Sequence, residues 1–144
     1  PVFNKLDARL AASIMSIGAV KGFEIGDGFG VSVANGSTNN DNFTLENGKV
    51  TKKTNHAGGI LGGMSDGSPI ILRAAVKPTP SIASMQETIT QNHEPTSIQI
   101  KGRHDPVIVP RAVVVVESMT AITLVDLLFT NMSARMDRLI DFYR

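Results

Sequence analysis

Cysteine and tryptophan are both absent from this 144-residue chain. The lack of cysteine excludes disulfides, thiolate metal sites and a cysteine nucleophile, and it fits a reducing compartment such as the cytoplasm. Aromatic residues make up only 5% of the chain and the net charge is +1. The chain therefore has few aromatic side chains on which bases could stack and no strong positive field, so we expect no nucleic-acid partner. The three histidines are scattered without carboxylates at ligand spacing, so we expect no metal site.

The sequence also lacks the basic and then apolar opening of a secretory signal peptide. Its longest apolar run, residues 112–129, contains Glu117 and Asp126 and is therefore a poor membrane span. Hydrophobic residues make up 42% and charged residues 19%, which is typical of one globular domain covering residues 1–144. The chain opens on Pro1 and enters a helical pattern at once, so we expect it to be a fragment of a larger protein.

The first third combines a helical pattern with glycine and polar segments. Apolar residues recur on one helical face at spacings of three and four, namely Phe3, Leu6, Leu10, Ile14 and Ile17. Gly18 is typical of a helix end, and residues 20–33 predict a strand broken by bulges, because they alternate in places and carry four glycines. Residues 35–54 are polar, and we expect a mobile excursion there with a tight hairpin at Asn47-Gly48.

Residues 58–63 contain four glycines, too many for a stable helix or an ordinary strand. They either form turns or leave a flat surface for a ligand, and the pattern favours neither alternative; His56 beside them is a possible ligand contact. Residues 69–76 predict a buried strand, and residues 88–100 predict a half-buried hairpin. The C-terminal third is helical, with Pro110 in a first turn and Ser133 as the cap of a second helix.

Three ionisable side chains stand side by side in Gly102-Arg103-His104-Asp105-Pro106. Arg103 can hold an anion through two parallel hydrogen bonds, and His104 and Asp105 can hold or move protons near neutral pH. The alternative is a surface ion pair, which contributes little to stability.

A second polar loop, Lys77-Pro78-Thr79-Pro80-Ser81, follows the strand predicted at 69–76. It joins a cation and two hydroxyls on a stiff backbone, and hydroxyls and amides at a strand end can bind phosphate; a plain proline-rich strand exit is the alternative. Should the two strand ends meet, Lys77 and Arg103 would grip one phosphorylated ligand. Neither G-x-G-x-x-G nor G-x-x-x-x-G-K-[ST] occurs, so we expect no Rossmann or P-loop site.

These motifs resemble the C-terminal part of chorismate synthase over nearly the whole chain. The resemblance also rests on Ala19-Val20-Lys21-Gly22, Glu24-Ile25-Gly26-Asp27-Gly28-Phe29, Asn55-His56-Ala57-Gly58-Gly59-Ile60-Leu61-Gly62-Gly63 and Pro110-Arg111-Ala112-Val113. It implies an α+β sandwich of helices between sheets, of which this chain would be the C-terminal part. It further implies a cytoplasmic, usually homotetrameric lyase of aromatic amino acid biosynthesis. That enzyme converts 5-enolpyruvylshikimate-3-phosphate to chorismate by 1,4-elimination of phosphate and needs reduced FMN; whether it reduces the flavin itself, with NADPH, stays open.

The resemblance implies residue roles as well. The residues that match flavin contacts are Gly18, Ala19, Gly62, Lys77, Pro78, Thr79, Pro80, Ser81 and Arg103. Those that match the catalytic set are Arg103, at flavin and substrate, and Asp105, the acid near the flavin's reactive nitrogen. His104 joins the candidate catalytic residues because it can hold or move a proton near neutral pH. The chain departs from the family at Gly18, Val107 and Val114, where a larger residue, cysteine and proline are frequent.

The family's N-terminal part, with further essential histidines and phosphate-binding arginines, has no counterpart here. We therefore expect the chain alone to be inactive, to bind FMN weakly or not at all, and to self-associate through apolar faces left bare. Two alternatives remain open, a non-catalytic module that binds phosphorylated ligands and an assembly domain.

Overall fold

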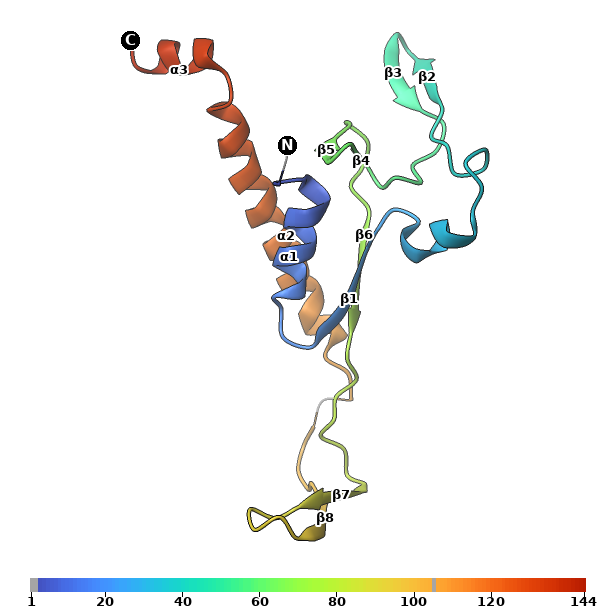
Figure 1. Ribbon diagram of the computed structural model, residues 1–144, viewed down its shortest axis with the longest axis vertical. Helices are drawn as coiled ribbons and strands as arrows, with labels where there is room; N and C mark the ends of the chain where they lie inside the picture. The colour runs from blue at the N-terminus through green and yellow to red at the C-terminus, as the bar shows by residue number, and fades with distance from the viewer. Residues whose placement is uncertain (1–2, 105) are drawn as a thin grey trace.

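The computed structural model describes residues 3–104 and 106–144 and has an α+β architecture. Its strands form four antiparallel pairs: β1 (Val20–Ile25) with β6 (Leu72–Val76), β2 (Phe43–Glu46) with β3 (Lys49–Lys52), β4 (Ile60–Leu61) with β5 (Met64–Ser65), and β7 (Met85–Ile89) with β8 (Pro95–Gln99). The β1–β6 ladder and two long helices form the body, from which the β2–β3 and β7–β8 hairpins project in opposite directions (Figure 1).

Helix α1 (Leu6–Met15) provides most of the core. Its predicted apolar face is confirmed, because Leu6, Leu10 and Ile14 are all buried. Leu6 and Leu10 pack with Ile60 of β4 and with partly buried side chains of β1, of helix α2 (Val109–Met132) and of the segment before β6. Two details differ from the prediction. Phe3 is exposed ahead of the helix, and the helix ends at Met15, before Gly18, with the left-handed turn at Ala19 (φ 70°).

The strand predicted over residues 20–33 ends early, at Ile25, and a 3₁₀ helix (Gly28–Val33) follows it. The cause is a tertiary contact at Gly26, which has φ +57°. A Cβ at this position would lie 1.9 Å from the His56 carbonyl oxygen, so the backbones can approach only because glycine stands there. The strand prediction was therefore right for the first six residues and wrong for the rest.

The tight turn predicted at Asn47-Gly48 is confirmed in the β2–β3 hairpin. Asn47 and Gly48 have φ values of 52° and 75°, which suit the two-residue turn between β2 and β3. The β7–β8 hairpin forms where residues 88–100 predict one, but its strands are mostly exposed, not half-buried. The mobility of residues 35–54 stays a prediction.

Helix α2 is apolar on nearly every side, and of its residues only Thr123 is buried. Pro110 lies in its first turn as predicted. Ser133 caps the end of α2 and not the start of α3 (Met136–Phe142), whose N-cap is Arg135. An Arg9–Asp126 ion pair of 2.8 Å joins α1 to α2. By length and composition α2 also qualifies as a membrane span; this is a weak indication, because core helices of globular proteins qualify too.

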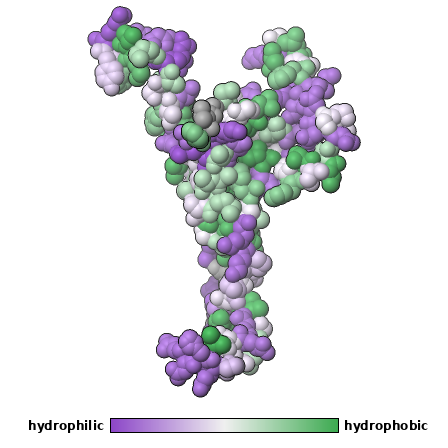
Figure 2. Space-filling view, in the orientation of Figure 1, coloured by the Kyte–Doolittle hydropathy of each residue, from purple (hydrophilic) through white to green (hydrophobic). Residues whose placement is uncertain are grey.

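Hydrophobic side chains are unusually common on the surface of this chain. Figure 2 shows them on the body and on the projecting hairpins. The exposed set on α2 comprises Val109, Val113, Val114, Val115, Ile122, Val125, Leu128, Phe129 and Met132. A helix that is hydrophobic all round is normally buried, so we expect further protein surface to cover α2.

Candidate functional site

A cavity of about 380 Å³ lies at the end of the β1–β6 ladder where β6 gives way to the proline-rich loop. Its lining residues are Ala19, Lys21, Lys77, Pro78, Thr79, Pro80 and Ile108. The structure thus brings together five of the residues predicted to bind the cofactor. We call this cavity the lysine pocket.

The wall of the lysine pocket is built where strand pairing stops. The Lys77 amide donates a 2.7 Å hydrogen bond to the Ala19 carbonyl, which extends the ladder by one rung beyond the Val20–Val76 pair. Pro78 has no amide proton and cannot continue the ladder. Ala19 holds a left-handed backbone, which is uncommon for a residue with a Cβ and is frequent at binding sites.

Two features make the lysine pocket suitable for an anion. Lys21 and Lys77 are both exposed and both line it, and none of the described residues that line it is acidic. In addition, the Thr79 hydroxyl oxygen is buried and has no hydrogen-bond partner among the described residues. Buried hydroxyls are normally satisfied, so the hydrogen-bonding capacity of this oxygen is left unused by the described residues.

Lys21 is the residue of this pocket that the sequence analysis did not select. A signal was nevertheless present, because Lys21 is a cation two residues beyond Ala19, which the family resemblance had already marked as a flavin contact. Strand periodicity cannot place it, because Ala19 has a left-handed backbone and the ladder is bulged between Val20 and Gly22.

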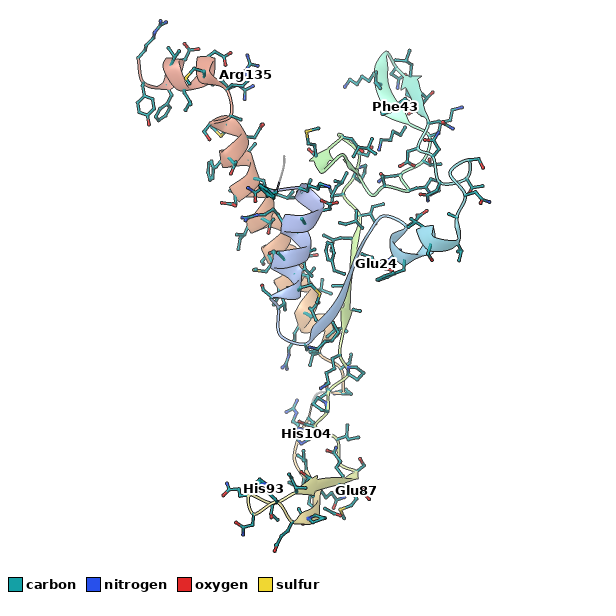
Figure 3. The ribbon with its side chains drawn as sticks, in the orientation of Figure 1. Glu24, Phe43, Glu87, His93, His104 and Arg135 are labelled. Atoms are coloured by element: carbon teal, nitrogen blue, oxygen red, sulfur yellow. The ribbon has the colours of Figure 1, made fainter. Side chains whose placement is uncertain are left out.

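Arg103 and His104 lie on the segment that returns from β8 to α2. This segment runs beside the loop that leaves β6: the Gln99 side-chain amide donates to the Ala83 carbonyl at 3.1 Å, and Ile108 lines the lysine pocket. Figure 3 shows His104 on the narrow stretch between the body and the β7–β8 hairpin. Arg103 and His104 are exposed and make no hydrogen bond or ion pair with any described residue. Asp105, the predicted acid, lies outside the described residues.

The remaining predicted residues stand apart from this pocket. Gly18 and Ser81 flank its lining in sequence without joining it. Gly62 lies in the β4–β5 turn, near the opposite end of the β1–β6 ladder (Figure 1). The five residues of β6 alone measure about 17 Å at the usual strand rise. Gly62 therefore does not line the lysine pocket, and a ligand that reached both would have to extend along the β1–β6 ladder.

The glycine-rich run forms turns, which was one of the two alternatives that the sequence left open. Gly58, Gly59, Gly62 and Gly63 all have φ between 58° and 80°. A Cβ on Gly62 would meet nothing within 4 Å, so its turn presents bare backbone to open space. His56 is paired with Asp27, with 2.7 Å between its Nδ1 and the carboxylate, and among the described residues no group of acids and histidines could hold a metal ion.

Comparison with known proteins gives a consistent result. The family model described as "Chorismate synthase" matches residues 1–129. The chain is 66% identical to chorismate synthase of Agathobacter rectalis and 65% identical to that of Lachnospira eligens, in each case over 100% of this chain and 39% of the relative. The chorismate synthase of Methanococcoides burtonii is 59% identical over 88% of this chain and 35% of its own length.

A solved structure described as "Crystal Structure of Chorismate Synthase" matches with a TM-score of 0.69 and 32% identity. The match covers 96% of this chain and 35% of that chain, and it confirms the predicted α+β fold. The chain therefore spans well under half the length of the proteins that it matches.

Proposed function

Because this chain belongs to the chorismate synthase family, we propose that it supplies the flavin-phosphate pocket and part of the catalytic surface of a chorismate synthase. The reaction is the 1,4-elimination of phosphate from 5-enolpyruvylshikimate-3-phosphate. The bond from carbon to the phosphate oxygen and one C–H bond break, a new C=C bond forms, and phosphate and a proton leave. The chemistry that reduced FMN supplies when bound is transient electron density, with no net redox change.

The observation that carries this proposal is the buried Thr79 hydroxyl, which has no hydrogen-bond partner among the described residues and belongs to a residue that lines the same pocket as two lysines. An unsatisfied buried hydroxyl costs about 1–3 kcal/mol, and a phosphate oxygen can accept a hydrogen bond from it. Lys21 and Lys77 would neutralise the phosphate charge, since ammonium groups bind phosphate as point charges. The residues present therefore fit a phosphorylated cofactor.

The prolines of the loop contribute stiffness, and Arg103, His104 and Asp105 on the neighbouring segment contribute anion binding and proton handling. Pro78 and Pro80 fix φ near −65° and so reduce the entropy lost when the loop closes on a ligand. Arg103 would hold an anionic group by two parallel hydrogen bonds. His104 and Asp105 would hold or deliver the proton that the elimination moves, and these roles rest on the family resemblance.

We further propose that the protein works in the cytoplasm as a homo-oligomer, a tetramer in the intact enzyme, with neither nucleic acid nor membrane as a partner. The exposed apolar residues of α2 support an assembly role, because they need a cover. Activity would require the part of the family's chain that this segment does not span.

A chimera tests the proposal. In it, this chain replaces the matching 39% of the Agathobacter rectalis protein, to which it is 66% identical. With reduced FMN under anaerobic conditions, we expect the chimera to release phosphate from 5-enolpyruvylshikimate-3-phosphate and the 144-residue chain alone to release none. A folded chimera that binds FMN without releasing phosphate would support a binding module instead. A folded chimera that does not bind FMN would refute the pocket.

A further inference from the structure

A buried ion-pair network lies outside the lysine pocket, at the base of the β2–β3 hairpin. Lys52, the last residue of β3, forms an ion pair with Asp66, and its Nζ is 3.9 Å from an Asp41 carboxylate oxygen. The three side chains are only 3%, 10% and 5% exposed, respectively. Lysine and aspartate are almost never buried this deeply unless they are paired. We call these three residues the carboxylate clamp.

Asp41 holds the beginning of the glycine-rich segment, residues 55–65. Its carboxylate accepts hydrogen bonds from the amides of His56 and Ala57, at 2.8 and 2.9 Å, and from the Thr54 hydroxyl at 2.7 Å. Burial alone would raise the pKa of Asp41, but these donors together with Lys52 lower it below its ordinary value. Asp41 is therefore a carboxylate whose oxygens accept hydrogen bonds from the backbone at His56 and Ala57, and these bonds orient that backbone.

Asp66 holds the other end of the same segment. Its amide donates to the Gly59 carbonyl at 3.1 Å, and its carboxylate accepts from the Ser68 amide at 2.9 Å. Burial would raise the pKa of Asp66, but the hydrogen bond from Lys52 and those from Ser68 lower it. One ammonium group, that of Lys52, thus ties together the two ends of the glycine-rich segment.

This segment needs external restraint because its glycines have the largest conformational freedom to lose on folding. Inside the segment, the Gly59 amide donates to the Asn55 side-chain oxygen at 2.7 Å, the Gly58 amide donates to the Asn55 carbonyl at 3.1 Å, and β4 pairs with β5. Contacts with other parts of the chain include the Asn55 side-chain amide, which donates to the Pro69 carbonyl at 2.8 Å, and the Leu6 amide, which donates to the Gly63 carbonyl at 2.8 Å. The β4–β5 turn beyond them carries Gly62, whose backbone faces open space. Where backbone atoms form a ligand-binding surface, the contacts at the ends of the segment determine how accurately those atoms are positioned.

We propose that Lys52, together with Asp41 and Asp66, is a positioning residue that fixes the glycine-rich segment and thereby presents the Gly62 turn to the flavin. This inference rests on the proposed function. It also gives residues 35–54 a role beyond that of an excursion, since the β2–β3 hairpin delivers Lys52 to the clamp.

The first arm of the test is hydrogen exchange on the 144-residue chain. Lys52→Met removes the ammonium group and keeps the length of the side chain, and Lys53→Met at the exposed neighbouring position is the matched control. We expect faster exchange at the amides of His56, Ala57 and Asp66 in Lys52→Met, with the amides of α1 unchanged. Asp66→Asn, which retains an acceptor for the Ser68 amide, is the milder variant should Lys52→Met not fold.

The second arm measures FMN binding to the chimera. We expect Lys52→Met to raise the Kd for FMN at least about tenfold, whereas saturating FMN restores the rate of phosphate release, because misplaced binding groups weaken complexes steeply. A role in stability alone would leave this Kd unchanged in the folded fraction.

The outcomes separate the two proposals. If exchange in residues 55–66 does not change in Lys52→Met or Asp66→Asn, the clamp does not position the segment and the inference is wrong. Faster exchange with an unchanged Kd for FMN would also overturn it, because the segment would then not serve the flavin. An unmodified chimera that binds no FMN refutes the proposed function, and hydrogen exchange alone then decides whether the clamp restrains the segment.

Discussion

Replacing Thr79 with valine should change stability and ligand affinity in opposite directions. Thr79 lines the lysine pocket, and its hydroxyl is buried without a hydrogen-bond partner among the described residues. Such a group costs the ligand-free protein about 1–3 kcal/mol, and valine keeps the branched shape while removing the oxygen. We therefore expect Thr79→Val to stabilise the ligand-free 144-residue chain by about 1 kcal/mol or more. For a chain of this size, 1 kcal/mol corresponds to a rise in Tm of about 2–4 °C.

The same substitution should weaken binding of FMN. A hydrogen bond to a charged group contributes about 1.5–3 kcal/mol, so loss of the bond to a phosphate oxygen should raise the Kd by roughly 10- to 150-fold. The assay is a calorimetric titration of the chimera with FMN, set beside thermal unfolding of the chain without ligand.

Thr51 provides the matched control. Its hydroxyl is the other buried oxygen without a hydrogen-bond partner in the described part of the chain, but it lies in β3, away from the lysine pocket. Thr51→Val should stabilise the ligand-free chain in the same way and leave FMN affinity unchanged. Equal effects of the two substitutions on FMN affinity, or a loss of ligand-free stability in Thr79→Val, would show that the Thr79 hydroxyl is not an unsatisfied group that binds the phosphate.

Three further predictions concern the stability and self-association of the chain. Leu10→Ala should lower the free energy of unfolding by about 2–5 kcal/mol in denaturant titrations, because it opens a cavity in the core; exposed Met15→Ala is the control, and an equal loss there would contradict the α1 core. The pKa values of Asp41 and Asp66 are lowered in the folded state, so their contribution is complete above the unfolded value of about 3.9 and is lost as pH falls through the lower folded values. Unfolding followed against pH should therefore show a loss of stability below about pH 4 that is reduced in Asp66→Asn. Light scattering at rising concentration should show self-association through α2, and a strictly monomeric chain would contradict that expectation.

The parts of the fold that the sequence predicts well are those that depend on neighbours along the chain. The buried face of α1 follows from the spacing of Leu6, Leu10 and Ile14, and the β2–β3 turn follows from Asn47-Gly48, which tolerates positive φ. Ser133 shows the limit even here, since a serine can flank either helix. The spacing alone cannot say which one it caps.

The parts that the sequence does not predict depend on contacts between distant segments. The strand from Val20 ends early because the Gly26 backbone meets that of His56. Lys52 looks like one of two solvated lysines in a polar stretch, and its burial between Asp41 and Asp66 appears only once the hairpin is folded back. In the site, the loop from Lys77 to Pro80 could be recognised from its chemistry, whereas its meeting with Lys21 and Ile108 requires the β1–β6 pairing.

In the proposed function, the lysine pocket binds the phosphate of a flavin. The most direct measurement compares the affinities of the chimera for FMN and for riboflavin, which differ only in that phosphate, and repeats the comparison with Lys77→Ala. We expect FMN to bind about 100-fold more tightly than riboflavin, because charge-assisted hydrogen bonds to the phosphate form only with FMN. Most of this difference in affinity should disappear in Lys77→Ala. Equal affinities for FMN and riboflavin, or a preference for FMN that survives Lys77→Ala unchanged, would contradict the proposed function.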